Sequence, residues 1–380
     1  MNILFIHPFD IRYPGGAETW ISEVAIGLKE KGHGVCILYS KYGDVNLYCS
    51  RNVFKNLKKH GVEVDACRYV KLVRGFPILD PLTLYKKLAY YDIVYFMAYP
   101  PNEVTLTFLR NVIRTPIISG FHTMLNPDYS LLHKLYSPIY FKLYGNFDAL
   151  HVLNKWTYYV FVKKYGIDSE KVFFIPNGVN MSLYYIENNP EDKFYVLFTG
   201  RLEKDKGADI LCKIIAEFNN NYPELMKDVE FLIAGTGLYK DAVKKLGERY
   251  KNVRYLGLVN KEDLRKTYAR SSVYLIPSRS EVMPFRVLEA MASGLPVVGS
   301  NIPGLRDLIN DENLGKLIRV GEITEFCRAI IYYYSLWKYS PKDYFKTRGE
   351  IRLQVARNYG WEQIIVKLEN MFRVVLRNKS

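Results

Sequence analysis

The sequence predicts an α/β protein built on parallel sheets, with enough chain for two domains. Short apolar runs that suit buried strands alternate along the chain with stretches of helical apolar spacing. Strands separated by helices form parallel sheets whose two faces are both covered. A chain of 380 residues is long enough for two domains of common size, each with its own core.

The composition is that of an ordinary globular protein, with 49% hydrophobic and 24% charged residues. No apolar run approaches the roughly 18 residues of a membrane-spanning helix. The start, Met1 to Phe5, leads directly into a strand without signal-peptide features, so we expect a cytoplasmic protein. The five cysteines are scattered and include no C-x-x-C pair, which argues against a disulfide framework and against a zinc site.

The formal net charge of +14 favours anionic partners through long-range attraction. Cations are densest between residues 51 and 74, where they alternate with apolar and aromatic side chains: Arg51, Lys55, Lys58, Lys59, Arg68, Lys71 and Arg74. Such a mixture suits contact with the headgroup layer of an anionic membrane. The protein would then bind peripherally to the inner face of that membrane. A solvated charged surface explains the same residues. No nucleic-acid-binding module accompanies the charge, so we expect no nucleic-acid partner.

The first strand, Asn2–His7, runs into a loop that ends in Gly15 and Gly16. An amphipathic helix follows, stops at Gly32 and precedes the strand Val35–Tyr39. Amides in a glycine loop at a helix start can approach an anion closely, although a simple tight turn would look the same. The spacing is not G-x-G-x-x-G, so a nicotinamide cofactor has weak support.

The strands expected next in the first half are Val62–Ala66, Ile93–Met97, Ile117–Gly120, Leu150–Leu153 and Val172–Ile175. In open parallel sheets, the ligand crevice lies beyond the carboxyl ends of the strands. His122 falls just past such an end, within ISGFHTM. It is a candidate substrate contact or an ordinary structural histidine, whereas His151 has no context that singles it out.

A polar stretch, Ile186–Lys193, predicts a linker before the strand Tyr195–Phe198. The loop that follows this strand carries Arg201 and Lys206 and leads into a helix from about residue 208. Cations at a strand end beside a helix start can hold a diphosphate, Arg by its planar fork and Lys as a point charge. A solvated basic loop is the alternative.

Beyond the strand Val273–Ile276, the chain breaks at Pro277 and resumes as a helix. Glu281 lies where this helix begins, and Glu289 lies about two turns further on, so the two carboxylates need not share a target. Pro284 suits the first turn of this helix, whose free amides favour negative charge. Two solvated glutamates on a surface helix would show the same spacing.

Three segments resemble the retaining glycosyltransferases of family 4: PGGAE, GRLEKDKG and the E-x7-E pair followed by EAMASGLPVV. The resemblance covers nearly the whole chain. It implies the GT-B fold, with two facing Rossmann-like domains and a C-terminal helix that crosses back to the first domain. It also implies an acceptor-binding domain over residues 1–185, a nucleotide-sugar-binding domain over 190–357 and the crossing helix over 358–380.

The resemblance assigns roles to the matching positions. It implies catalytic roles for His122, near the reacting sugar, for Arg201 and Lys206, on the leaving diphosphate, and for Glu281, on the donor sugar. The donor-binding set that it implies, with Glu289 on the ribose and residues 258 and 259 beside the base, is Gly15, Gly16, Arg201, Lys206, Leu258, Val259, Glu281, Met283, Pro284, Phe285 and Glu289. Many members carry a Gly-Phe-Gly type loop where this chain has Val282, Met283 and Pro284, which leaves the donor sugar open.

The implied activity is transfer of a sugar, a hexose by preference, from a UDP- or GDP-linked donor to a glycan, lipid or small-molecule acceptor, with retention. The chain has no D-x-D pair, so we expect metal independence and no cofactor. A nucleotide-sugar epimerase or phosphorylase of the same fold, a dinucleotide-dependent oxidoreductase and a non-enzymatic adaptor at a membrane or on nucleic acid are the alternatives.

Overall fold

The structure is a computed structural model that describes residues 1–13, 15–42, 52–71, 77–123, 141–187 and 193–379. These residues form two compact units. Unit 1 comprises Met1–Asn177 and Trp361–Ser380, and unit 2 comprises Gly178–Gly360. The short stretch after Asn177 belongs to unit 2, where the Val179 amide donates to the carbonyl oxygen of Tyr359 at 2.8 Å.

Unit 1 is built on a parallel sheet that, in the described residues, has seven strands in the order β3-β2-β1-β6-β7-β8-β9. Its central strands are mostly apolar and are buried on both faces of the sheet, as expected for a parallel sheet covered by helices. The strands are β1 (Asn2–His7), β2 (Gly34–Ser40), β3 (Glu63–Cys67), β6 (Ile93–Met97), β7 (Ile117–Phe121), β8 (Ala149–Val152) and β9 (Val172–Phe174), and a separate antiparallel pair joins β4 (Tyr69–Lys71) to β5 (Pro77–Leu79).

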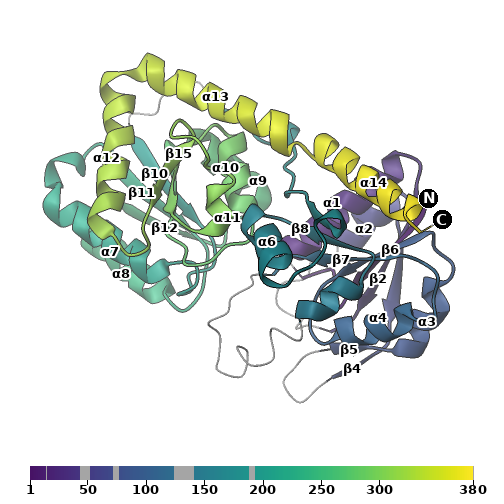
Figure 1. The fold of residues 1–380 in the computed structure, drawn as a ribbon. Helices are drawn as coiled ribbons and strands as arrows, with labels where there is room; N and C mark the ends of the chain where they lie inside the picture. The colour runs from purple at the N-terminus through teal and green to yellow at the C-terminus, as the bar shows by residue number, and fades with distance from the viewer. Residues whose placement is uncertain (14, 43–51, 72–76, 124–140, 188–192, 380) are drawn as a thin grey trace. The chain divides into compact units, whose positions relative to one another are not determined.

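The helices of unit 1 are α1 (Gly16–Glu30), α2 (Asn52–Lys59), α3 (Pro81–Leu88), α4 (Asn102–Arg110), α6 (Lys155–Tyr159) and the C-terminal α14 (Trp361–Arg377). Although α1 and α14 lie at opposite ends of the chain, they pack together (Figure 1). Gly27 of α1 makes this approach possible, because a Cβ atom there would lie 1.9 Å from Cδ1 of Ile365. On the face of α14 that packs inward, Ile364, Leu368 and Phe372 are fully buried.

Unit 2 repeats the design with a six-stranded parallel sheet among its described residues, in the order β12-β11-β10-β13-β14-β15. Helices α7 and α8 lie on one side of these strands and α9 to α11 on the other (Figure 1). The strands are β10 (Phe194–Thr199), β11 (Val229–Ala234), β12 (Val253–Gly257), β13 (Val273–Ile276), β14 (Val297–Ser300) and β15 (Gly315–Ile318). The helices are α7 (Ala208–Asn221), α8 (Lys240–Arg249), α9 (Lys261–Arg270), α10 (Phe285–Ala292), α11 (Pro303–Arg306), α12 (Ile323–Tyr339) and α13 (Pro341–Tyr359).

The predicted fold class is therefore confirmed: two parallel sheets with covering helices, and a C-terminal helix that packs on the first unit. Within the described ranges, no helix is both long enough and apolar enough to cross a membrane. Cys49, Arg51, Arg74 and the side chain of Lys71 lie outside what the structure describes. Of the other cysteines, Cys36, Cys67 and Cys327 are buried, as small hydrophobic residues would be.

The docking of α14 on unit 1 can be tested by truncating its buried stripe. We expect Leu368→Ala to lower the free energy of unfolding by about 2 to 5 kcal/mol, because Leu368 is fully buried and its truncation removes packed side-chain atoms from the core. Val366 on the same helix is 43% exposed, so Val366→Ala should cost less than about 0.5 kcal/mol. Urea unfolding of both variants measures the difference. Equal midpoints would show that α14 contributes little to unit 1.

Candidate active site

The predicted cationic loop and the predicted glutamate loop follow two neighbouring strands of unit 2. Residues 200–207 follow β10, residues 277–284 follow β13, and β10 pairs with β13 in parallel. Because the carboxyl ends of parallel strands meet at one edge of a sheet, the two loops are brought side by side. The sheet order therefore explains how residues 75 positions apart share a site.

Lys206 and Glu281 meet at this edge, with 2.8 Å between Nζ and Oε1. The Ser278 hydroxyl donates to the same carboxylate oxygen at 3.0 Å. Both side chains of the pair are mostly buried, with 25% of Lys206 and 10% of Glu281 exposed. The pair therefore lies in a partly desolvated place, where a charge acts more strongly on a neighbour than it does in water.

Two glycines allow the backbones around this pair to come close. Gly207 has φ +71°, and a Cβ atom there would lie 2.0 Å from the carbonyl oxygen of Pro277. On the other side, a Cβ atom at Gly304 in α11 would lie 2.1 Å from the carbonyl oxygen of Glu281. The Glu281 loop is thus held between the loop after β10 and the start of α11.

Arg201 does not join the Lys206–Glu281 pair. Its side chain is 64% exposed and pairs with Asp205 at 2.8 Å within its own loop. A second arginine, Arg279, fixes the two loops to each other. Its guanidinium contacts both carboxylate oxygens of Asp209, at 2.6 and 2.7 Å, and donates to the carbonyl oxygen of Lys204. The hydrogen bonds from Arg279 lower the pKa of Asp209, so this clamp is charged at neutral pH.

Glu289 belongs to a different cluster, further along α10. Its Oε2 atom accepts hydrogen bonds from Arg286, at 3.0 Å, and from the Tyr268 hydroxyl, at 3.2 Å. The Tyr268 oxygen lies 2.9 Å from the Thr199 hydroxyl at the end of β10. Burial raises the pKa of Tyr268 well above its ordinary value, so the phenol stays protonated and can donate. Glu289 is therefore held by Arg286 of its own helix and by Tyr268, which is in turn held by Thr199 at the end of β10.

The start of α10 differs in one detail from the sequence prediction. Pro284 does not lie in the first turn but precedes it as the N-cap, with φ −75° and ψ 121°. Its extended ψ lies outside the helical range, so the helix begins at Phe285. Met283 is buried beside it. Leu258 and Val259 follow β12, and Leu258 is 68% exposed, a placement that suits contact with a ligand.

In unit 1, Gly15 is the N-cap of α1 and Gly16 is its first residue. Gly15 has an extended backbone with φ −125°, so its conformation does not require glycine. The Glu18 carboxylate lies against it, since a Cβ atom at Gly15 would be 2.1 Å from Glu18 Oε2. Glu18 also pairs with Nε2 of the buried His7 at 3.0 Å. A carboxylate therefore already occupies the mouth of this helix.

His122 follows β7 and is hydrogen-bonded through Nε2 to the Tyr95 hydroxyl at 2.8 Å. The same hydroxyl lies 2.6 Å from Nδ1 of His151, on β8. Burial lowers the pKa of His122 well below its usual value, and the neighbouring His151 and His7 lower it further, so His122 is neutral. No sequence context singled out His151, but the strand order places it next to Tyr95, which joins it to His122 through two hydrogen bonds.

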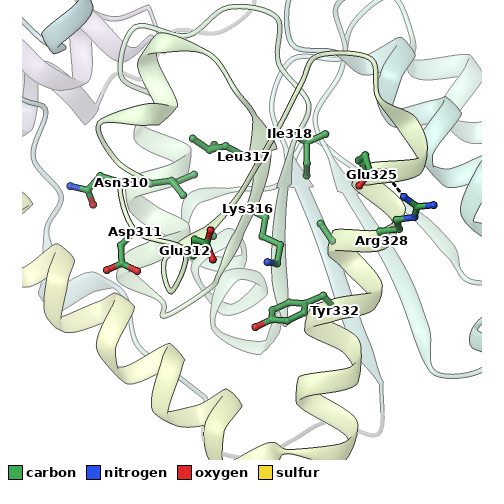
Figure 2. A pocket seen from close by; sticks show the side chains of 12 residues that line it. Asn310, Asp311, Glu312, Lys316, Leu317, Ile318, Glu325, Arg328 and Tyr332 are labelled. Carbon is green, nitrogen blue, oxygen red and sulfur yellow. Dashed lines mark hydrogen bonds and ion pairs between the residues drawn. The ribbon is translucent and has the colours of Figure 1, made fainter.

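A shallow hollow of about 590 Å³ lies elsewhere in unit 2, along β15 and α12 (Figure 2). Three of its charged side chains are already engaged: Lys316 lies 4.2 Å from the centre of the Tyr332 ring, and Arg328 contacts Glu325 at 2.6 Å. None of the predicted site residues lines it. No cluster of His, Cys, Asp or Glu in the part of the chain that the structure describes is arranged to hold a metal ion.

Two family models match the chain in succession, Glycosyltransferase Family 4 over residues 14–183 and Glycosyl transferases group 1 over residues 185–349. The chain belongs to the family 4 glycosyltransferases. It is thus an enzyme that transfers a sugar from a nucleotide-sugar donor, and the resemblance carried by PGGAE, GRLEKDKG and the E-x7-E pair is confirmed.

Relatives of this glycosyltransferase include the phosphatidyl-myo-inositol mannosyltransferase of Mycolicibacterium smegmatis. That protein is 25% identical over 340 residues, which cover 87% of this chain and 84% of the relative. Similar solved structures include Anabaena HepE in complex with UDP, with a TM-score of 0.78, 19% identity and coverage of 98% of this chain and 100% of HepE. HepE in complex with UDP-glucose gives a TM-score of 0.75, 18% identity and coverage of 98% and 100%. These likenesses confirm the GT-B fold.

Sequence reasoning missed the residues that position the site in this glycosyltransferase. Two of them hydrogen-bond to predicted residues, Ser278 to Glu281 and Tyr268 to Glu289. A third, Arg279, joins the two loops through Asp209. No sequence motif marked these three residues. Gly120 was the available signal for the Tyr95–His151 link, since a glycine inside a strand often marks a close approach.

The close approach at Gly207 gives a stability prediction. Gly207→Ala places a Cβ atom against the Pro277 backbone and forces a left-handed conformation on alanine. Gly321 is the matched control, because it has φ +89° but no atom within 4 Å of a built Cβ. We expect Gly321→Ala to lower the free energy of unfolding by about 1 to 2 kcal/mol. Gly207→Ala should lower it by at least about 1 kcal/mol more, because the added methyl group has no space beside the Pro277 backbone. Equal urea midpoints for the two variants would contradict the tight loop contact.

Proposed function

We propose that this glycosyltransferase holds its donor on unit 2, with Lys206 and Arg201 on the diphosphate, Glu281 on the sugar and Glu289 on the ribose. The observation that carries the proposal is the Lys206–Glu281 pair, 2.8 Å apart at the carboxyl ends of β10 and β13. The pair joins one positive and one negative group at the edge where parallel sheets bind ligands. A donor needs both, because its diphosphate is anionic and its sugar offers hydroxyl donors.

The chemical demand of the reaction supports these roles. When the bond between the sugar and the phosphate breaks, negative charge grows on the leaving diphosphate. Fixed cations near that oxygen stabilise the transition state more than the ground state. Lys206 is fixed by Glu281, whose carboxylate also accepts a hydrogen bond from Ser278. The start of α10, which follows the Glu281 loop, adds a partial positive charge. We propose that these groups replace a metal ion and that the sugar is transferred with retention.

Glu281 is built to accept a hydrogen bond from the donor sugar. Lys206 and Ser278 both contact its Oε1 atom. Among the residues that the structure describes, no group pairs with Oε2. An ionised carboxylate can only accept hydrogen bonds, so Oε2 is suited to a sugar hydroxyl. The ammonium of Lys206 has three donors and can contact Glu281 and a phosphate oxygen together.

The identities of the donor's nucleotide base and of its transferred sugar are further proposals. HepE, a structural neighbour, is described with UDP and UDP-glucose. UDP-glucose is accordingly the first donor to test, with GDP-mannose as the main alternative because of the mannosyltransferase relative. The comparisons favour glycosyl transfer over the epimerase, phosphorylase, oxidoreductase and adaptor alternatives. An epimerase would turn over its nucleotide sugar without releasing free nucleoside diphosphate.

For the acceptor, we propose a lipid-anchored molecule at an anionic membrane surface, with a soluble carbohydrate as the alternative. The relative's name supports a lipid, because it describes transfer to phosphatidyl-myo-inositol. In unit 1, α2 buries Leu57 and exposes Lys55, Lys58 and Lys59. A helix of this kind can lie on anionic headgroups. In this proposal the protein is cytoplasmic and peripheral on the inner face of the membrane.

The donor site is tested by Lys206→Met, which removes the charge and keeps the side chain's bulk. We expect turnover to fall about 10²- to 10³-fold and UDP to bind more weakly. The measurement is nucleoside diphosphate release from UDP-glucose or GDP-mannose with phosphatidylinositol vesicles or free glucose as acceptor. Lys204→Ala is the control, because Lys204 is exposed in the same loop. Glu281→Gln should reduce turnover but spare UDP affinity, because UDP has the ribose and the diphosphate of the donor but lacks the transferred sugar. Unchanged turnover in Lys206→Met would contradict the assignment.

The membrane surface has its own test. The double change Lys58→Glu and Lys59→Glu should lower binding to phosphatidylinositol-containing vesicles at low salt, because each cation near such a surface contributes about 1 kcal/mol. The matched control reverses Lys244 and Lys245, which are exposed on α8 of unit 2. Sedimentation with vesicles measures binding. If the two double variants bind equally well, α2 is not the docking surface.

A further inference from the structure

Three neighbouring strands of unit 1 place a buried tyrosine between two histidines. Tyr95 on β6 pairs in register with Ile118 on β7, two residues before Gly120, so that Tyr95 and Gly120 lie on the same face of the sheet. Gly120 in turn pairs with His151 on β8. A Cβ atom at Gly120 would lie 1.9 Å from the Tyr95 hydroxyl. The phenol therefore crosses β7 directly over Gly120 and reaches His151.

The directions of the hydrogen bonds that join His122, Tyr95 and His151 follow from the last acceptor, the carbonyl oxygen of Ile175. Nε2 of His151 lies 2.7 Å from the carbonyl oxygen of Ile175, which can only accept, so Nε2 carries a proton. Nδ1 of the neutral ring must then accept from the Tyr95 hydroxyl at 2.6 Å. With its own proton committed, the Tyr95 oxygen accepts from Nε2–H of His122 at 2.8 Å. The backbone carbonyl of Ile175 thus sets the tautomer of His122 through His151 and Tyr95.

Both histidines are neutral in this arrangement. Burial lowers the pKa of His151 to about 4, and the pKa of His122 is held well below its usual value. Burial also raises the pKa of Tyr95, so the phenol keeps its proton. Trp20 fixes the rings, since it stacks on Tyr95 with centroids 4.9 Å apart and packs edge-on against His122 at 4.6 Å.

A neutral His122 with its proton on Nε2 presents a lone pair on Nδ1. Within the described ranges, no group donates to that atom, and it is not among the enclosed polar atoms of the structure. His122 itself is half-buried at the carboxyl end of β7, where ligand crevices of parallel sheets lie. Its outward nitrogen can accept a hydrogen bond and cannot donate one.

We propose that Tyr95 and His151 are positioning residues that lock His122 as a hydrogen-bond acceptor for a substrate hydroxyl. The proposal rests on the proposed sugar transfer and on the role that the family resemblance implies for His122, near the reacting sugar. It goes further by fixing the polarity of that contact. A sugar hydroxyl can donate to Nδ1, whereas a substrate group that has only acceptors, such as a carbonyl or a phosphate oxygen, would face a lone pair and be disfavoured.

The tautomer can be observed directly by NMR in the full-length protein labelled with ¹⁵N at its six histidines. Long-range ¹H–¹⁵N correlations distinguish a protonated from an unprotonated ring nitrogen, and His122→Gln assigns the signals of His122. We expect a neutral His122 with its proton on Nε2 at neutral pH. Tyr95→Phe should convert it to a mixture of tautomers. A proton on Nδ1 in the unchanged protein, or the same single tautomer in Tyr95→Phe, would overturn the proposal.

Tyr144→Phe is the matched control, because the Tyr144 hydroxyl is also buried and donates to Glu103 at 2.8 Å, outside the His122 network. It should leave the His122 signals unchanged. In the transfer assay, Tyr95→Phe should lower kcat/KM about 10- to 100-fold and Tyr144→Phe much less. Equal losses would show a purely structural role. If the unchanged protein transfers sugar from no nucleotide sugar, the proposed function fails, while the NMR result still decides the tautomer.

Discussion

The close contact between the loop after β10 and the loop after β13 is the constraint on which the rest of unit 2 depends. Gly207 lets one backbone lie against the carbonyl of Pro277, and the clamp between Arg279 and Asp209 holds the two loops together. Only with this contact in place can Lys206 reach Glu281. The neighbouring strands bring the loops to one edge, and the glycine decides how close they come.

Unit 1 uses the same device for a different purpose. There, Gly120 lets the Tyr95 ring cross a strand, so that a carbonyl on one side determines the protonation of a histidine on the other. In both units, a glycine that allows a close approach sets the geometry of a charged or polar group at a strand end. Fixed donors and acceptors of this kind need little reorganisation during a reaction, which is how electrostatic stabilisation becomes effective.

The sequence was sufficient for the fold and for the residues that carry local motifs. Alternating strands and helices predicted the parallel sheets, and the loop containing Arg201 and Lys206 was recognisable by itself. The partners of those residues were not predictable, because they depend on strand order. Tyr268 supports Glu289 and His151 orients Tyr95 only because the sheet places distant segments side by side. Pro284 shows a local limit as well, since its residue type allows both the cap and the first turn.

The central claim is that the Lys206–Glu281 pair receives the diphosphate and the sugar of the donor. A crystal structure of the protein with UDP-glucose tests this most directly. The account predicts a phosphate oxygen within hydrogen-bond distance of Lys206 Nζ, a sugar hydroxyl on Glu281 and the ribose at Glu289. A nucleotide sugar bound elsewhere, with the Lys206–Glu281 pair still facing only solvent, would contradict it.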